Sequence, residues 1–393
     1  MFNSKYRGLD RDTLMRENSV EKISGIKRII FDCDGVIVFD RDSYRSTIIK
    51  AVDYYFLKLL GLKGDRGRLV TQDDIQRIKD TGSFNNDWNL TYFLIMYYIV
   101  LLLNSVIKEV KFRDIGRPQT TFSLNKTLKM LRVVGSTATR LGINITYLEM
   151  MRNDRISGLD KLVGRLDERS PISIPGEIQS FFKLEDRVLK IAEYLCPFKM
   201  EGDDLLRRLF DEIYLGHRLY EKFTGRKAVF KFDKGLIDKE RIIPTRQTLE
   251  RIEERFGLSG IYSERPREEA LYTLRRHKIL KYFDEKAMFF NEDIIGEDPR
   301  QLDLGKPDPR SFLRLIEISS MKNHTVAYVG DTVADAVLIR NVKASGVKDL
   351  VFIGALSSSP NPEGLKSKFM ELEADAIIYD VNNIPTMIEG LEI

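Results

Sequence analysis

An apolar run, IKRIIFD, occupies residues 26–32 and ends in an aspartate. A run of this kind is typical of a central parallel strand that is buried on both faces of its sheet. From Asp40 to about Arg226, however, the sequence is patterned as one helix after another, and short apolar runs return only past Gly235. The first strand must therefore pair with strands that follow a long helical insertion.

The last third of the chain alternates short apolar runs with amphipathic helices. The expected strands are LSGIYS, KAMFFN, TVAYVGD, VFIGA and AIIYD. One intervening helix, in IIPTRQTLERIEERFG, is expected to start at Pro244 and to stop at Gly257. The alternation indicates right-handed βαβ units, and hence an α/β fold: a doubly wound parallel sheet with a large α-helical domain inserted after the first strand.

A chain of 393 residues is too long for one ordinary core, so two domains are expected. We assign residues 1–39 and 234–393 to the α/β domain and residues 40–233 to the helical one. Only two cysteines are present, far apart at Cys33 and Cys196, which suits a reducing compartment. The N-terminal residues are polar and charged, unlike a signal peptide. A cytoplasmic location is therefore expected.

The formal net charge is +4, too small for nucleic acid to be an expected partner of the whole chain. Between Lys108 and Arg169 there are 13 Lys and Arg against 7 Asp and Glu. Because these basic residues are spread out, a solvated surface is favoured over a binding site for phosphorylated ligands. The role of the segment 108–175 stays open.

Residues 89–107 carry no charge and are apolar enough to resemble a membrane span. Three tyrosines lie within this segment, and Asn104 and Ser105 interrupt its end. We therefore favour a buried helix of the helical domain and expect no membrane partner.

Two pairs of aspartates stand at the carboxyl ends of expected strands, where ligands bind in doubly wound sheets. Asp32 and Asp34 follow the first strand, with Gly35 after them; such a pair can hold a divalent cation, with one acid free to attack and the other to transfer protons. Asp331 ends a later strand, and Asp335 lies on the same face of the helix that follows. Taken alone, the first pair could be an acidic turn and the second a helix cap.

Two further segments offer groups to an anion. Lys306 lies in GKPDP, whose prolines stiffen the loop, and an ammonium fixed there can neutralise phosphoryl oxygens. Ser263 ends the run LSGIYS, and its hydroxyl and the amides that follow it, at Glu264 and Arg265, can bind an anion. Alone, a surface lysine and a helix N-cap are the simpler interpretations.

Together and in this order, the four segments resemble the motifs of the haloacid dehalogenase-like (HAD) hydrolase superfamily: DxDG, a Ser or Thr, a Lys, and GDxxxD. The resemblance implies that Asp32 is a nucleophile that forms an aspartyl-phosphate and that Asp34 is the general acid and base. It also implies Mg²⁺, held by the Asp32 carboxylate, the backbone carbonyl of Asp34, and Asp331. Asp335 would steady the water shell of the metal or orient Lys306. Catalysis would then fall to Asp32, Asp34, Ser263 and Lys306, and substrate binding to Gly35, Ser263, Glu264, Arg265 and Lys306.

The helical insertion lies where this superfamily places its mobile cap of the first type. Within it, the segment TGSFNNDW looks like the substrate-reading loop of phosphoglycolate-phosphatase-like members. This likeness implies substrate contacts by Asn85, Asn86, Asp87 and Trp88. The structural alternative is an N-cap at Asp87 or at one of the asparagines, with Trp88 packed against the core.

The sequence thus predicts a Mg²⁺-dependent phosphatase that acts on a small phosphorylated metabolite, a phosphomonoester. A phosphotransferase or phosphomutase that uses the same intermediate is the first alternative. The second is a non-catalytic binding protein on a HAD-like fold. A homodimer is considered, and the substrate stays open.

Overall fold

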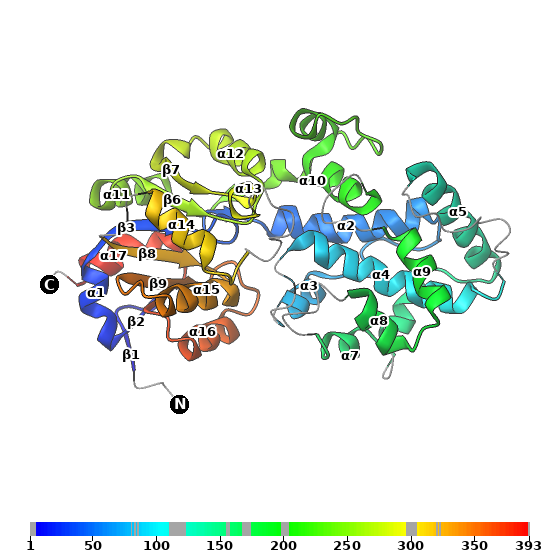
Figure 1. Cartoon of the computed structure of the whole chain (residues 1–393), viewed down its shortest axis with the longest axis horizontal. Helices are drawn as coiled ribbons and strands as arrows, with labels where there is room; N and C mark the ends of the chain where they lie inside the picture. The colour runs from blue at the N-terminus through cyan, green and yellow to red at the C-terminus, as the bar shows by residue number, and fades with distance from the viewer. Residues whose placement is uncertain are drawn as a thin grey trace. The chain divides into compact units, whose positions relative to one another are not determined.

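The computed structural model in Figure 1 describes residues 5–79, 81, 84, 86–109, 123–154, 158–166, 174–197, 204–295, 305–319, 321 and 324–391. The chain divides into two compact units. An α/β unit contains residues 1–41 and 240–393, and a helical unit contains residues 42–239.

The α/β unit is built on an eight-stranded sheet of order β1-β2-β10-β9-β8-β3-β6-β7. Its strands are β1 (Tyr6–Gly8), β2 (Thr13–Arg16), β3 (Ile26–Phe31), β6 (Ser259–Tyr262), β7 (Phe283–Phe289), β8 (Thr325–Gly330), β9 (Leu350–Ala355) and β10 (Ala376–Ile378). From β10 to β7 all neighbours are parallel. The predicted α/β fold with a parallel sheet is confirmed, and β3 pairs with β6 and β8 from beyond the insertion.

The edge of the sheet differs from the prediction. Strand β2 pairs antiparallel with β10, and β1 pairs antiparallel with β2. These strands are short, and only β2 shows the alternation of a half-buried strand, with Met15 fully buried. So few residues carry too weak a periodicity to be distinguished from a loop.

Helices cover both faces of this sheet (Figure 1). They are α1 (Val20–Ser24), α11 (Arg246–Phe256), α12 (Arg267–Arg276), α13 (Asn291–Ile295), α14 (Arg310–Ile318), α15 (Val333–Ala344), α16 (Pro362–Glu371) and α17 (Ile384–Glu389). Ile29 and Phe31 pack in one hydrophobic cluster with α11, α12 and α17, whereas Ile30 packs in another with α14, α15 and α16. Because successive side chains of a strand point to opposite faces, β3 is buried on both sides, as its apolar run predicts.

Of the two predicted ends of α11, the C-terminal one is found, whereas the helix begins at Arg246, after Thr245 as its N-cap, and not at Pro244. The Thr245 side chain accepts a hydrogen bond from the backbone N–H of Thr248, and Gly257, with φ +72°, ends the helix. A left-handed φ at that position suits glycine. A separate two-stranded ribbon, β4 (Val38–Phe39) with β5 (Arg241–Ile242), joins the two segments of the α/β unit.

The second unit is helical throughout its described elements. Its π-helical turns are η2 (Arg41–Arg45, which begins at the boundary) and η3 (Tyr55–Leu59), and η5 (Leu236–Lys239) is a 3-10 helix. Its α-helices are α2 (Ser46–Tyr54), α3 (Gln72–Lys79), α4 (Asp87–Val106), α5 (Leu124–Arg140), α6 (Ile145–Arg152), α7 (Leu159–Val163), α8 (Ile174–Phe182), α9 (Asp186–Leu195) and α10 (Leu205–Thr224). Helix α4 packs against α2, α5, α6, α8, α9 and α10.

Helix α4 contains most of the uncharged segment 89–107. Among the described residues it alone is long and apolar enough to cross a membrane, and 83% of its most apolar window is buried inside the structure. Such burial explains the composition without a bilayer, because a helix that is apolar all round needs apolar neighbours on every side. The helix is a central element of the helical unit, as expected.

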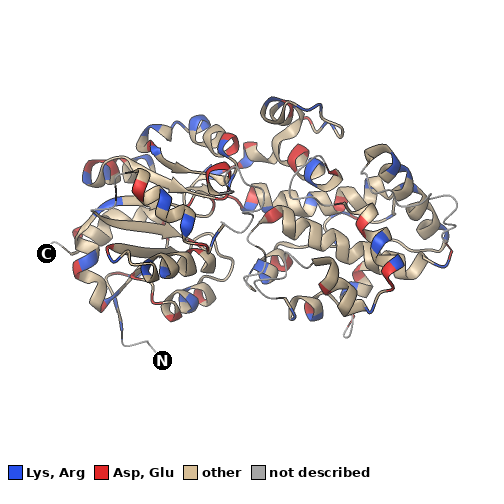
Figure 2. Cartoon of the chain, in the orientation of Figure 1, with Lys and Arg blue, Asp and Glu red and all other residues tan. Residues whose placement is uncertain are grey.

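The charges of the helical unit are less evenly spread than the spacing of basic residues along the sequence suggests. Helix α5 carries four exposed basic residues and no acid, whereas acids and bases mix on α6 and α7 (Figure 2). The basic character of the described part of the segment 108–175 is thus concentrated on α5.

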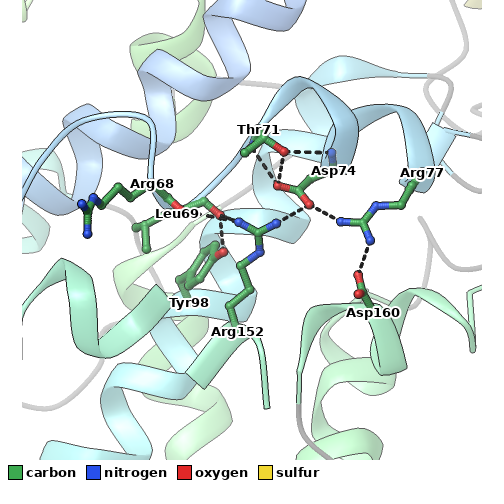
Figure 3. A network of polar contacts seen from close by, with 8 residues as sticks. All are labelled: Arg68, Leu69, Thr71, Asp74, Arg77, Tyr98, Arg152 and Asp160. Carbon is green, nitrogen blue, oxygen red and sulfur yellow. Dashed lines mark hydrogen bonds and ion pairs between the residues drawn. The ribbon is translucent and has the colours of Figure 1, made fainter. Parts of the chain in front are cut away.

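A buried carboxylate joins helices α3 and α6 of the helical unit, and through Arg77 the network extends to α7 (Figure 3). Asp74 in α3 accepts hydrogen bonds from the backbone and hydroxyl of Thr71, and it forms ion pairs with Arg77 and with Arg152 of α6. Arg77 continues to Asp160 of α7 at 2.8 Å. The side chain of Asp74 is fully buried, so these donors replace the water that a carboxylate otherwise requires.

Candidate active site

The loop after β3 is a tight turn held by backbone hydrogen bonds. The backbone N–H of Gly35 donates to Val38, and those of Ile37 and Val38 both donate to Cys33. The hydroxyl of Ser358, a residue that the sequence did not single out, donates to the Gly35 carbonyl at 2.7 Å. These hydrogen bonds hold the backbone of the turn, and so they fix the positions from which the side chains of Asp32 and Asp34 extend.

The ammonium of Lys306 joins carboxylates that follow two neighbouring strands, β3 and β8. Its Nζ lies 2.5 Å from Asp32 Oδ2 and 2.8 Å from Asp335 Oδ1. Asp32 follows β3, and Asp335 lies in the first turn of α15, after β8. The rings of Tyr262 and Tyr328 lie 5.8 Å and 5.7 Å from the same Nζ, so the charge is enclosed by aromatic faces as well as by acids.

Asp335 has a full set of donors. Its Oδ1 accepts from the Tyr328 hydroxyl at 2.8 Å and from Lys306, and its Oδ2 accepts from the backbone N–H and the hydroxyl of Thr332 at 2.9 and 2.6 Å. Thr332 and Asp335 also form a capping box that starts α15. Of the two roles considered for Asp335, these contacts favour the orientation of Lys306, and capping accompanies that role instead of replacing it.

Asp331 completes a group of three acids. Carboxylate oxygens of Asp32, Asp331 and Asp335 all lie within 4.8 Å of one another. A Cβ added at Gly35 would meet Asp331 Oδ2 at 1.9 Å, so the two residues are in close contact. Within the described part of the chain, no hydrogen bond or ion pair holds the Asp331 carboxylate, and it is only partly buried.

These residues fit a magnesium ion. Three carboxylates and one ammonium leave a net charge of −2, which a divalent cation would balance. The donors are hard oxygens, the type that Mg²⁺ prefers. Since Asp335 is saturated with donors, Asp32 and Asp331 are the carboxylates that would hold the ion, together with the backbone carbonyl of Asp34.

The pKa shifts follow from the same crowding. Burial, with the neighbouring Asp335 adding to it, raises the pKa of Asp32 to about 7, although Lys306 opposes the rise. Burial, followed by the charges of Asp335 and Asp32, raises the pKa of Asp331 well above its usual range. For Asp335, burial acts in the same direction, but Lys306 and the hydrogen bonds outweigh it and lower the pKa. A cation beside Asp32 and Asp331 would favour their ionised forms.

A substitution at Gly35 tests the contact with Asp331. Gly35→Ala is expected to raise the Mg²⁺ concentration that gives half-maximal turnover of p-nitrophenyl phosphate by at least ~10-fold, because the added methyl group displaces the carboxylate. Gly61→Ala is the matched control, since Gly61 has the same φ, +77° against +76°, and nothing within 4 Å of an added Cβ. Equal Mg²⁺ requirements in both variants would contradict the assignment of Asp331.

Asp34 lies in an ion-paired cluster beside this group. Its Oδ1 accepts a hydrogen bond from Arg265 Nη1 at 2.9 Å, and Arg265 Nη2 lies 2.8 Å from Glu240 Oε2. The side chains of Arg265 and Glu240 are fully buried, whereas Asp34 retains 28% of its exposure. Arg265 was predicted to bind substrate directly, but a buried guanidinium between two carboxylates favours a different role.

Ser263 and Glu264 follow β6, next to β3 in the sheet. Ser263 is buried, and its Oγ accepts from the Arg265 backbone N–H at 3.3 Å. Glu264 Oε1 accepts from the Lys306 backbone N–H at 2.7 Å and thereby holds the lysine loop. Phosphate binding by Ser263 stays a prediction, and the observed contact of Glu264 is with the chain itself.

The predicted substrate-reading loop makes structural contacts where it is described. Asn86 caps α4, Asp87 pairs with Lys79 at 2.8 Å, and the Trp88 indole N–H donates to Asp211 at 2.9 Å. Asn85 lies outside the described residues. The structural alternative accounts for Asn86 and Trp88, and Asp87 forms an ion pair; substrate contacts by these residues stay predictions.

Comparison with known proteins identifies the type of domain. Residues 239–348 match the family described as haloacid dehalogenase-like hydrolase. The match includes Ser263, Lys306, Asp331 and Asp335, and it begins at residue 239, so the segment with Asp32 lies outside it. No curated protein matches the chain in sequence.

Several solved structures resemble the chain. An X-ray structure from the Northeast Structural Genomics Consortium is 19% identical, with a TM-score of 0.63 over 93% of this chain and 99% of that one, a likeness that shows the fold alone. A phosphatase from Thermococcus thioreducens is 20% identical, with a TM-score of 0.45 over 88% of this chain and 98% of that one. A predicted phosphoglycolate phosphatase from Haemophilus somnus is 13% identical, with a TM-score of 0.39 over 92% and 98%. The last two are too distant to support an argument.

Proposed function

The chain belongs to the haloacid dehalogenase-like hydrolase superfamily, and we propose that it is a phosphatase: a Mg²⁺-dependent phosphohydrolase that acts on a small phosphomonoester through an aspartyl-phosphate at Asp32. One observation carries the proposal. The Lys306 ammonium contacts Asp32 and Asp335, and the Asp331 carboxylate lies within 4.8 Å of both acids, at the carboxyl ends of β3 and β8.

In the first half-reaction, a carboxylate oxygen of Asp32 attacks phosphorus as the bond to the ester oxygen breaks. Asp34 gives its proton to that leaving oxygen, and the alcohol departs. In the second half-reaction, Asp34 takes a proton from water, the water oxygen attacks phosphorus, and the bond to Asp32 breaks. Phosphate is released and both acids return to their starting states.

Lys306 and Ser263 would bind phosphoryl oxygens and offset the charge that develops on them. Mg²⁺, held by Asp32, Asp331 and the Asp34 carbonyl, would supply further positive charge at the phosphoryl group. Asp335 contributes by holding Lys306, whose pKa is raised well above its usual value because Asp32 and Asp335 outweigh the effect of burial. The ammonium therefore stays charged throughout the reaction.

Removal of the metal gives a direct test. Purified protein is expected to hydrolyse p-nitrophenyl phosphate with Mg²⁺ and to lose at least ~100-fold of that rate in EDTA, since the metal supplies several kcal/mol of transition-state stabilisation. Added Mg²⁺ should restore the rate. Hydrolysis that EDTA leaves unchanged, or no hydrolysis under either condition, would contradict the proposal.

A cap function for the helical unit, the cytoplasmic location and the homodimer stay predictions. A transferase or mutase would be distinguished by the fate of the phosphoryl group. Turnover in the presence of glycerol is expected to release inorganic phosphate in the same amount as p-nitrophenol, whereas an excess of p-nitrophenol would indicate transfer to the alcohol.

A further inference from the structure

A fully buried arginine supports the carboxylate of Asp34. Arg265 Nη1 donates to Asp34 Oδ1 at 2.9 Å, while Nη2 donates to both oxygens of Glu240, at 2.9 and 2.8 Å, and to the hydroxyl of Thr273 at 3.3 Å. A guanidinium is a rigid planar fork, so a contact fixed at one nitrogen determines the direction of the other.

Glu240 is itself anchored. It is fully buried at its side chain, it accepts a hydrogen bond from the Thr273 hydroxyl, and its backbone carbonyl lies 3.1 Å from His277 Nε2. It directly precedes β5, whose Arg241 pairs with Phe39 of β4. Asp34 in turn forms a bridge with Val38, the first residue of β4. Asp34 and Glu240 are thus joined twice, through the ribbon and through Arg265.

Stability alone does not explain such an arrangement. Burying a charged pair costs about as much desolvation energy as the attraction returns, and apolar residues of similar volume commonly stabilise a core better. The exposure is also graded: Arg265 and Glu240 have none, whereas Asp34 keeps 28%. The buried pair therefore presents a partly exposed carboxylate in a fixed orientation.

We propose that Arg265 is the positioning residue of the general acid, with Glu240 holding Arg265 in place, and that Arg265 does not contact the substrate. This inference rests on the proposed function, in which Asp34 donates a proton to the leaving oxygen. Arg265 fixes Oδ1, and the proton is carried on Oδ2. Loss of the fork would let the carboxyl group rotate away from the leaving oxygen without affecting Asp32, Lys306 or the metal ligands.

The leaving group provides a readout that a general structural defect would not reproduce. p-Nitrophenolate is a stable anion and leaves with little help, whereas phenolate is more basic and needs the proton as the ester bond breaks. The two substrates, p-nitrophenyl phosphate and phenyl phosphate, are otherwise of similar size. A misplaced acid must therefore lower kcat/KM for phenyl phosphate selectively.

In the experiment, kcat/KM is measured for both substrates with saturating Mg²⁺ in the wild type, Arg265→Gln and Asp34→Asn. Arg265→Gln is expected to lose at least ~10-fold more kcat/KM on phenyl phosphate than on p-nitrophenyl phosphate, part of the 10²–10⁴-fold that proton transfer typically contributes. Asp34→Asn should show the same pattern more strongly. Arg265→Lys should recover only part of the loss, because an ammonium lacks the fork.

Equal losses on the two substrates, or no loss, would overturn the inference while leaving the proposed function intact. A wild type that hydrolyses neither ester would overturn both. Because Arg265→Gln leaves Glu240 buried without its partner, the double variant Arg265→Gln/Glu240→Gln is measured alongside; it removes both buried charges and is expected to show the same selectivity for leaving group. A double variant with wild-type rates on both esters would also overturn the inference.

Discussion

Asp32→Asn is expected to lower kcat for p-nitrophenyl phosphate with Mg²⁺ by at least ~10⁴-fold, the scale of loss found when an enzyme's nucleophile is removed. An amide oxygen is a poor nucleophile, and no other group of the site takes its place. Asn still occupies the position beside Cys33 and Lys306, so the fold should persist. The measurement is the steady-state rate, with the circular dichroism spectrum as the check on folding.

Asp349→Asn is the matched control, because Asp349 is an exposed acid of the same unit that precedes β9. It should leave kcat within about twofold, as surface substitutions generally do. A correctly folded Asp32→Asn protein with more than a few per cent of the wild-type rate would contradict the assignment of the nucleophile.

Asp74→Asn is expected to destabilise the helical unit by about 3 kcal/mol, toward the lower end of the range for breaking a buried ion pair. The substitution leaves Arg152, whose side chain is 13% exposed, without its charged partner, and it weakens the contacts to Thr71 (Figure 3). The loss of stability is expected near the lower end of that range because Arg77, the other ion-pair partner of Asp74, is half exposed and can be hydrated instead.

The sole tryptophan makes this measurement specific to the helical unit. Trp88 packs against Phe210 and donates to Asp211 within that unit, so its fluorescence during urea unfolding reports on the helices. Asp160→Asn is the control, since Asp160 pairs with Arg77 but is 74% exposed, and such pairs contribute only about 0–1 kcal/mol. Equal midpoints for the two variants would show that the buried network does not stabilise the unit.

Much of the α/β unit could be predicted because its strands are buried on both faces and therefore appear as continuous apolar runs. The acids at the ends of β3 and β8 could be brought together from the sequence, since parallel strands deliver their carboxyl ends to one edge of the sheet. Strands β1 and β2 escaped prediction because they are short edge strands without such runs. The concentration of exposed basic residues on α5 also became apparent only from the structure.

The residues that hold the candidate site in place could not be predicted from the sequence. Glu240 lies in a charged stretch, DKERII, where nothing distinguishes it from solvated neighbours, and only the fold brings it to Arg265. Tyr328 lies within the expected strand TVAYVGD, where the sequence does not mark it as a site residue, yet its hydroxyl donates a hydrogen bond to Asp335. For Trp88, both interpretations suit the same local pattern; the contacts with Asp211 and Arg207 of α10 appear only in the structure, and substrate contact stays a prediction. From a local motif it is easier to identify the groups that react than to identify the distant residues that hold them in place.

The most direct test of the central claim is to find the residue that carries the phosphoryl group during turnover. Enzyme mixed with p-nitrophenyl phosphate and Mg²⁺ is quenched in acid within the first turnovers, digested, and analysed by mass spectrometry. We expect a phosphoryl group on the carboxylate of Asp32, lost on treatment with hydroxylamine as an acyl phosphate should be. A phosphoryl group on any other residue, in protein that is turning over the ester, would contradict the assignment of Asp32 as the nucleophile.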